Sequence, residues 1–274
     1  MRPALNPNWI VVVLVIGVLL ILLAGSFFPL TDPTRIAPRS RLMPPDWQYW
    51  LGTDQLGRDV FWRTVAASRI SVGVGVCVAL LSIFFGTAIA LVCATNRAID
   101  HVVMRIMDAA MAVPAILLAI VLVAMFRGGV VVVIIAISVP EIPRIVRLVR
   151  SIALSTMAEV YVEASRVLGT GMWRILLRHI LPATLPHLAV TGAYVCGSAI
   201  LIESGLSFLG AGVPPEIPTW GNMIAAGRIV FERAPWLVLA PGLMVTVTVL
   251  GFNLLGDALR DIVDPQARLL TVKS

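Results

Sequence analysis

Few residues of this chain have the types and spacing that chemistry requires. The sequence has a single lysine, Lys273, with no glycine nearby, whereas a phosphate-binding loop of the G-x-x-x-x-G-K-[ST] kind needs both. The histidines at 101, 179 and 187 are not spaced as in H-E-x-x-H, no Cys/His cluster has zinc-site spacing, and no G-x-S-x-G motif occurs. We therefore expect no catalytic residue, no metal site and no bound cofactor. Energy must then come from a partner or from an ion gradient.

One carboxylate interrupts an otherwise apolar stretch. Glu203 lies between Leu188 and Gly210, where a charged group is costly to bury and by default suggests a functional site. The side chain either faces the interior of a helix bundle and satisfies backbone or Ser/Thr groups, or it lines a pathway for a solute. A third alternative is that the apolar stretch is wrongly placed. Asp108, at the edge of another apolar stretch, is expected at a helix end.

A long polar segment contains a second candidate site. Residues 163–165 (Glu-Ala-Ser) predict a short helix, and Gly169 can end it with a positive φ or allow a close approach. Arg174 and Arg178 then lie four residues apart on the next helix, which we expect Pro182 to end. The pattern fits a docking element. A plain cytoplasmic helical loop that faces lipid head groups is the alternative.

The elements that must position these residues are membrane-spanning helices. The sequence has 59% hydrophobic and 13% charged residues, whereas ordinary globular chains have roughly 25% charged residues. This composition excludes a single water-soluble core and favours lipid as the solvent. A helix of about 20 apolar residues crosses the hydrocarbon layer, and six stretches approach or exceed that length. These stretches are Trp9–Leu30, Ile70–Thr95, Ala109–Phe126, Val130–Val139 if Ile145, Val146, Leu148 and Val149 extend it, Leu188 to about Gly210, and Ala234–Gly256.

Glycines and prolines indicate where these helices pack closely or bend. Gly73, Gly75 and Gly86 in the second stretch predict close helix packing, although no strict G-x-x-x-G occurs. Pro114 predicts a kink in the third stretch, and Pro114 and Pro241 are candidate hinges. The fourth stretch spans the membrane if its helix continues past two prolines. The first could be a signal peptide, but its apolar run exceeds the usual 7–15 residues, which favours a retained span.

The distribution of cations predicts the orientation. Residues 144–187 have six arginines and two glutamates, so the positive-inside rule places this segment in the cytoplasm. Six spans then place both ends of the sequence in the cytoplasm and residues 31–69 and 211–233 outside. In the first outer segment we predict a short amphipathic helix from Asp59 to Ser68, with Asp54 or Asp59 as its N-terminal anion. The tryptophans at 9, 220 and 236 are expected at membrane–water interfaces.

Three separated groups of residues resemble the permeases of binding-protein-dependent ABC importers. Glu163-Ala164-Ser165, then Gly169, then Leu181-Pro182 resemble the EAA signature, with Ser165 in place of the second alanine and His179 where an aliphatic residue is common. The second group, residues 51–60 (LGTDQLGRDV) and 68–71 (SRIS), resembles the entry to the second span in oligopeptide and dipeptide permeases. The third group resembles the closing half of the same permeases and comprises residues 207–212 (SFLGAG), 220–223 (WGNM), 256–261 (GDALRD) and 264–265 (DP). The chain is thus similar to the second permease subunit of the peptide/nickel importer family, the dipeptide-permease C or oligopeptide-permease C type.

This resemblance implies an all-α membrane protein with six transmembrane helices and the type I ABC importer permease fold. Residues 1–30 would hold the N-terminus and first span, and residues 31–69 an external segment with the short amphipathic helix. Residues 70–274 would form a five-span core with a cytoplasmic coupling loop at 150–186. The residues that couple to an ATPase subunit would be Glu163, Ala164, Ser165, Arg166, Gly169 and Thr170. Glu203 is the candidate pathway residue.

The resemblance also implies the function and the partners. The chain would form half of a pathway that imports di- or oligopeptides across the bacterial inner membrane, with nickel or a nickel chelate as the alternative solute. Its partners would be a second homologous permease subunit, two ATP-binding subunits that hold ATP and magnesium, an extracytoplasmic solute-binding protein and the lipid bilayer. Nucleic acid is excluded because the cations form no dense patch interleaved with aromatics. An ion-coupled secondary transporter is the alternative of another class, but such transporters usually have inverted repeats, and we find none.

Overall fold

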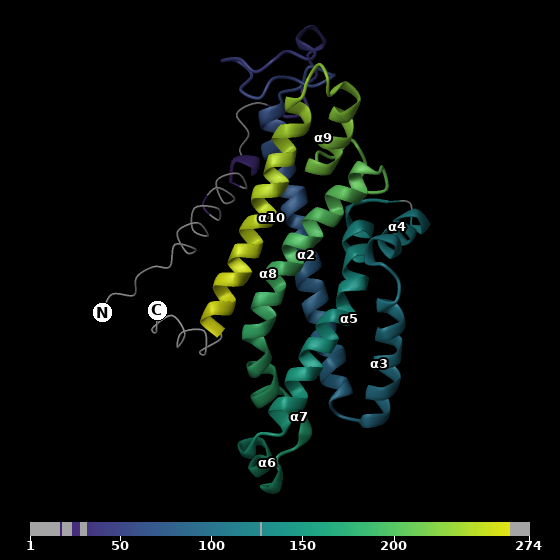
Figure 1. Ribbon diagram of the computed structural model, residues 1–274, viewed down its shortest axis with the longest axis vertical. Helices are drawn as coiled ribbons and strands as arrows, with labels where there is room; N and C mark the ends of the chain where they lie inside the picture. Colours follow the sequence, from purple (N-terminus) through teal and green to yellow (C-terminus); the bar gives the residue numbers. More distant parts are fainter. Residues whose placement is uncertain (1–16, 18–23, 28–31, 127, 264–274) are drawn as a thin grey trace, which may run out of the picture.

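The computed structural model describes residues 17, 24–27, 32–126 and 128–263, and these form an elongated helical bundle (Figure 1). From residue 32 onward the elements are η1 (Pro38–Ser40), α2 (Val60–Cys93), α3 (Arg97–Met111), α4 (Ala115–Met125), α5 (Val130–Met157), α6 (Val160–Val167), α7 (Met172–Ile175), η2 (Leu176–Ile180), α8 (Leu181–Phe208), α9 (Trp220–Gly227), η3 (Arg228–Val230) and α10 (Trp236–Val263). Within the described ranges, β pairing is confined to one isolated bridge between Thr53 and Asp59. The predicted all-α class is confirmed.

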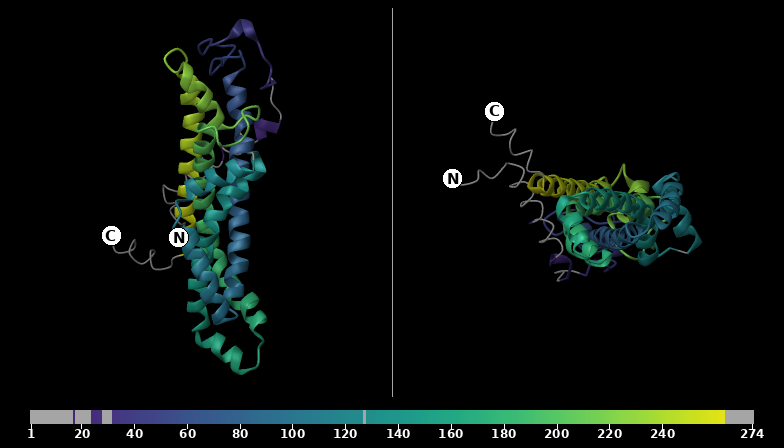
Figure 2. Two further views of the ribbon diagram at one scale, coloured as in Figure 1. Left: turned by 90° about the vertical axis from the view of Figure 1, so that its right-hand side faces the viewer. Right: turned by 90° about the horizontal axis from the view of Figure 1, so that it is seen from below.

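Four long helices run side by side along the long axis of the molecule (Figures 1 and 2). α2 packs against α5 and α8, and α8 packs against α10. Helix α6 lies at one end of the bundle, and α9 lies at the other end beside residues 32–59 (Figure 1). We call the α6 end the tip and the opposite end the loop end. The two sites described below lie at these two ends.

Within the part of the chain that the structure describes, three helical stretches are long and apolar enough to cross a membrane: α2, the joined stretch Met172–Phe208, and α10. They correspond to the second, fifth and sixth predicted spans. The first predicted span, 9–30, lies almost entirely outside the described residues. α5 has 28 residues and contains Pro140 and Pro143 inside one helix, so the fourth stretch continues past both prolines, but α5 is not among the described helices that are apolar enough to cross a membrane.

The third predicted span is not one straight helix. α3 ends at Met111, α4 begins at Ala115, and the two helices are bent by 89° at the break between them. The predicted kink at Pro114 is thus confirmed, and it is sharper than a kink inside a helix. Proline has no N–H to donate and disfavours the helical conformation of the residue before it, so the helix stops and restarts. Counted as one bent span, α3 and α4 bring the stretches able to cross a membrane to four among the described residues.

α2 begins where the sequence predicts but is longer than predicted. The Asp59 carboxylate accepts hydrogen bonds from the N–H groups of Phe61 (2.8 Å) and Trp62 (3.3 Å), which caps the helix. Burial raises the pKa of this carboxyl above its ordinary value, although both hydrogen bonds oppose the shift. The helix then runs for 34 residues, so a separate short helix that ends at Ser68 is wrong. The Ser68 hydroxyl donates to Val65 O within the helix (2.7 Å) and therefore does not interrupt it.

Two of the three predicted packing glycines make close helix contacts. A Cβ atom on Gly75 would lie 2.6 Å from Ile200 on α8, and one on Gly86 would lie 2.6 Å from Ile145 on α5. These glycines allow α2 to approach both neighbours closely. Gly73 has nothing within 4 Å of the equivalent position, so the packing prediction is wrong there.

Candidate functional site

The tip, residues 159–171, contains all six predicted coupling residues. Glu163, Ala164 and Arg166 are exposed on α6, and Ser165 is half-buried. Gly169 is exposed and Thr170 half-buried in the turn that follows. The structure therefore brings together the residues that the EAA-like motif singled out.

Gly169 closes the turn with a backbone that favours glycine. Its φ is +80°, the first of the two alternatives that the sequence left open, and no close approach occurs there. The Gly169 N–H donates to Arg166 O (2.9 Å), and the Thr170 N–H donates to Ser165 O (3.1 Å). This is the Schellman pattern, which satisfies the last carbonyls of a helix. The shape of the turn thus depends on one residue in the left-handed region.

The tip is anchored on one side and apolar on the other. Val162 is fully buried and belongs to a small core of six residues that attaches α6 to the bundle. In contrast, Val167 and Leu168 are 82% and 86% exposed. Exposed apolar groups in one place indicate a contact surface for lipid or for another protein. Val167 and Leu168 directly precede the turn at Gly169, and we call them the knob at the end of the bundle.

The segment after the tip differs from the prediction. Pro182 does not end the helix that carries Arg174 and Arg178. α7 passes through the π-helical turn η2 into α8, and Pro182 lies in the first turn of α8. Proline has no backbone N–H to donate. It is tolerated at this position because the hydrogen-bond pattern changes from π to α there, so no N–H is required from it. The tip is therefore joined to the fifth span by one continuous helical stretch of 37 residues.

At the loop end, Asp54 organises the segment before α2. Its carboxylate accepts hydrogen bonds from the N–H groups of Leu56 (2.8 Å) and Arg58 (2.9 Å) and pairs with Arg58 Nε (2.6 Å). Gln55 Nε2 donates to Ala226 O (2.9 Å), which fastens this segment to α9. Sequence reasoning offered Asp54 as a helix-capping anion, but it is the centre of a folded loop.

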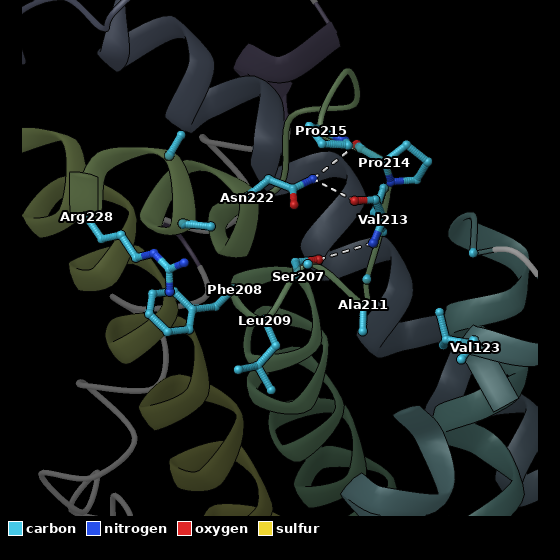
Figure 3. Close-up of a pocket in the computed structure, with 16 residues that line it drawn as sticks. Val123, Ser207, Phe208, Leu209, Ala211, Val213, Pro214, Pro215, Asn222 and Arg228 are labelled. Carbon is cyan, nitrogen blue, oxygen red and sulfur yellow. Dashed lines mark hydrogen bonds between the residues drawn. The ribbon is translucent and has the colours of Figure 1, made fainter. Parts of the chain in front are cut away.

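Trp220 and Asn222 hold the segment between α8 and α9. Trp220 is fully buried, and its indole N–H donates to Thr64 O on α2 (3.0 Å), so its side chain packs inside the protein and does not face lipid. Asn222 Nδ2 lies within 3.2 Å of the carbonyl oxygens of Val213, Pro214 and Ile217, and Figure 3 shows the first two contacts. The motif residues 220–223 therefore determine the shape of the loop.

Glu203 is fully buried near the C-terminal end of α8. Ser207 Oγ donates to Glu203 Oε1 (2.8 Å), and Ser71 Oγ on α2 lies 3.4 Å from Glu203 Oε2. The side chain thus faces the interior of the bundle among serine hydroxyls. At about 1.5 Å per helical residue, it lies roughly 45 Å from the start of α7, so the tip and Glu203 are separate sites.

A cavity of about 700 Å³ opens beside the loop between α8 and α9 (Figure 3). Its walls come from the end of α4 and residues 207–215, together with part of α9. Arg228 stacks over the Phe208 ring, 5.1 Å from its centre, on the rim. Sequence reasoning missed this cavity. The SFLGAG and WGNM motifs, which both contribute to its lining or shape, were the available signal.

The comparisons with known proteins agree with these features. Residues 82–269 match the family model described as the inner membrane component of binding-protein-dependent transport systems. A probable peptide ABC transporter permease protein of Sinorhizobium fredii is 47% identical over 237 residues, which cover 86% of this chain and 81% of the relative. A dipeptide transport system permease protein of Alkalihalophilus pseudofirmus is 37% identical over 268 residues, covering 96% of this chain and 88% of the relative.

A solved structure has a similar fold. The inward-facing MetNI methionine ABC transporter contains a chain that matches with a TM-score of 0.59. The match covers 75% of this chain and 98% of that chain at 19% sequence identity. At that identity the likeness concerns the fold.

Proposed function

We propose that this chain, which belongs to the family of inner membrane components of binding-protein-dependent transport systems, forms half of the pathway of an ATP-driven peptide importer. The chain is an inner-membrane permease subunit with the fold of an ABC importer permease. The relatives in Sinorhizobium fredii and Alkalihalophilus pseudofirmus have names that state peptide and dipeptide transport. These names support peptides over nickel as the solute.

The observation that carries the proposal is the apolar knob at the tip. A permease of this family depends on other subunits for ATP hydrolysis, and the tip offers a surface for one of them. Leu168 and Val167 are exposed beside the charged side chains of Glu163 and Arg166. A protein cleft would cover the two apolar side chains, which a position among polar lipid head groups would leave unburied, and the charged side chains are too costly to bury in the hydrocarbon interior.

The proposed complex contains four further proteins. A second homologous permease completes the pathway, and two ATP-binding subunits, which hold ATP and magnesium, bind below. A solute-binding protein delivers the solute at the loop end, which faces outward if the tip is cytoplasmic. Nucleotide-driven closure of the ATP-binding subunits moves the tip and shifts the bundle between inward- and outward-facing states. Such a shift requires that nucleotide or solute binds one state more tightly than the other.

The docking role of the tip can be tested by placing a charge on the knob. We expect Leu168→Glu to reduce the amount of ATP-binding subunit that copurifies with the tagged permease, because it would bury an unpaired charge in the interface. Ile229→Glu is the matched control, since Ile229 is 78% exposed at the loop end, against 86% for Leu168 at the tip. Full copurification and transport by Leu168→Glu would overturn the docking role.

The solute can be tested in proteoliposomes that contain the whole importer. We expect ATP-dependent uptake of labelled di- or oligopeptides when the solute-binding protein is added outside. Radioactive nickel provides the parallel assay. Uptake of nickel without peptides would replace the proposed solute, and uptake driven by an ion gradient without the ATP-binding subunits would refute the ATP-driven mechanism.

A further inference from the structure

Glu203 is connected to the loop between α8 and α9 through two serine hydroxyls. Ser207 donates to one oxygen of the Glu203 carboxyl, and Ser71 to the other. The same two hydroxyls each accept a backbone hydrogen bond from the loop. The Val213 N–H donates to Ser207 Oγ (3.3 Å), and the Trp220 N–H donates to Ser71 Oγ (3.2 Å).

This arrangement uses the hydrogen-bonding capacity of each group. A serine hydroxyl has one proton to donate and two lone pairs to accept with. Because each proton is directed to Glu203, the lone pairs of Ser207 and Ser71 are free to receive an N–H. The carboxyl group thereby determines the orientation of both hydroxyls. The two bonds are separated by seven residues, so they hold the segment from Val213 to Trp220 at both ends.

Close packing removes the room in which this segment could shift. A Cβ atom on Gly221 would lie 2.6 Å from Ser204 O, so the start of α9 rests directly on α8. Gly212 packs against Ser207 in the same way. Figure 3 shows Ser207 directed at Val213 on the wall of the cavity.

We propose that Glu203 is a positioning residue that fixes the mouth of the importer, through Ser207 and Ser71, in the shape that receives solute from the binding protein. The mouth is the segment from Leu209 to Thr219, which lines the cavity with residues 209–215. The identity of the delivered solute rests on the proposed function. The hydrogen bonds of Glu203, Ser207 and Ser71 are independent of it.

The discriminating substitution is Glu203→Gln. The glutamine side chain keeps the size of glutamate but has one acceptor oxygen, and its NH₂ group must donate. One of the two serines then loses its acceptor, and its hydroxyl turns away from the geometry that receives the loop N–H. Glu141→Gln is the matched control, because Glu141 is also buried in a long helix and its partner, Arg144, lies on the same helix (3.0 Å).

The first measurement is amide hydrogen exchange of residues 209–222 in the whole importer in lipid nanodiscs. We expect Glu203→Gln to raise exchange about 10-fold, the effect of one lost hydrogen bond, and Glu141→Gln to leave it unchanged. Ser207→Ala should raise exchange near Val213, and Ser71→Ala should raise it near Trp220. Glu203→Gln should add little near Val213 once Ser207 is alanine, because Glu203 acts there through that serine.

The second measurement separates a positioning role from a general loss of stability. We expect Glu203→Gln to raise, by about 5- to 10-fold, the concentration of loaded binding protein that gives half-maximal ATP hydrolysis, with the maximal rate retained. Unchanged exchange in residues 209–222 would overturn the relay. If Glu203→Gln fails to insert, unchanged exchange in both serine variants would overturn it equally. If exchange rises as expected but the rate of ATP hydrolysis does not respond to the loaded binding protein, the result counts against the proposed function instead.

Discussion

Gly169 offers the sharpest test of the tip, because its backbone and its surroundings can be separated. Its φ is +80°, and an added Cβ atom would meet nothing within 4 Å. An alanine at this position therefore suffers no collision, and its cost arises from the left-handed backbone alone, about 1–2 kcal/mol. Gly171, two residues on, also has nothing within 4 Å, but its φ is −63°. Gly171→Ala thus adds the same atom to the tip without the backbone cost.

A third variant reports whether the backbone is the cause. Asparagine tolerates the left-handed region better than alanine, so Gly169→Asn should recover part of the loss. A cost of 1–2 kcal/mol lowers the ratio of closed to open turns roughly 5- to 30-fold, so the closed fraction falls about 3- to 15-fold if the two forms are balanced at the start. We expect solute-stimulated ATP hydrolysis to fall in the order wild type and Gly171→Ala, then Gly169→Asn, then Gly169→Ala. The bulky Gly169→Leu should abolish the stimulation with normal membrane insertion.

The assay is the rate of solute-stimulated ATP hydrolysis by the reconstituted importer, normalised to inserted permease. Basal hydrolysis by the isolated ATP-binding subunits is the control for their integrity. Equal rates for Gly169→Ala and Gly171→Ala would refute the argument that the left-handed turn transmits the coupling. A lower rate for Gly169→Asn than for Gly169→Ala would refute the backbone explanation.

Two further predictions concern the bundle, and both are checked by thermal unfolding of the purified chain in detergent. Gly86→Ala should lower the stability of the folded chain by about 1–3 kcal/mol, because the added Cβ would lie 2.6 Å from Ile145. Gly73→Ala is the control: nothing lies within 4 Å of its Cβ, so its effect should be neutral or slightly stabilising. Trp220→Phe should destabilise by about 1–3 kcal/mol because it leaves Thr64 O without the indole N–H, and an unchanged melting temperature would contradict that role for Trp220.

Local features of the fold could be predicted from the sequence where one residue type has one physical consequence. Asp59 caps α2 because a carboxylate before an apolar run accepts the free N–H groups of a helix start. Gly169 has a positive φ, and Pro114 breaks the helix. In each case neighbouring residues in the sequence determine the outcome. The positions of most long helices could be predicted for the same reason, since apolar length alone identifies them.

Features that depend on contacts between distant segments could not be predicted in this way. Pro182 is a local exception: it does not end a helix, and the chain continues from a π-helical turn into α8 around it. Trp220 is buried, and its indole N–H donates to the carbonyl oxygen of Thr64, 156 positions earlier. The hydrogen-bond partners of Glu203 could not be predicted from the sequence either, since Ser71 lies 132 residues away on α2. Apolar periodicity gives no information on which buried polar groups meet.

The continuous helix from Met172 to Phe208 connects the tip with the loop end. At about 1.5 Å per residue its 37 residues are roughly 55 Å long, with the tip at one end and Ser207 at the other. Close-packed helices deform little, so a displacement of the tip that tilts this helix must also move Glu203 and Ser207. The π-helical turn at Leu176–Ile180 is where such a movement would be lost, because bends in long helices concentrate at turns of this kind. Ile175, Leu176 and Ile180 lie in or beside this turn. They are buried in the small core that also contains Val162 of α6. The burial that anchors the tip therefore also stiffens the turn through which its motion must pass.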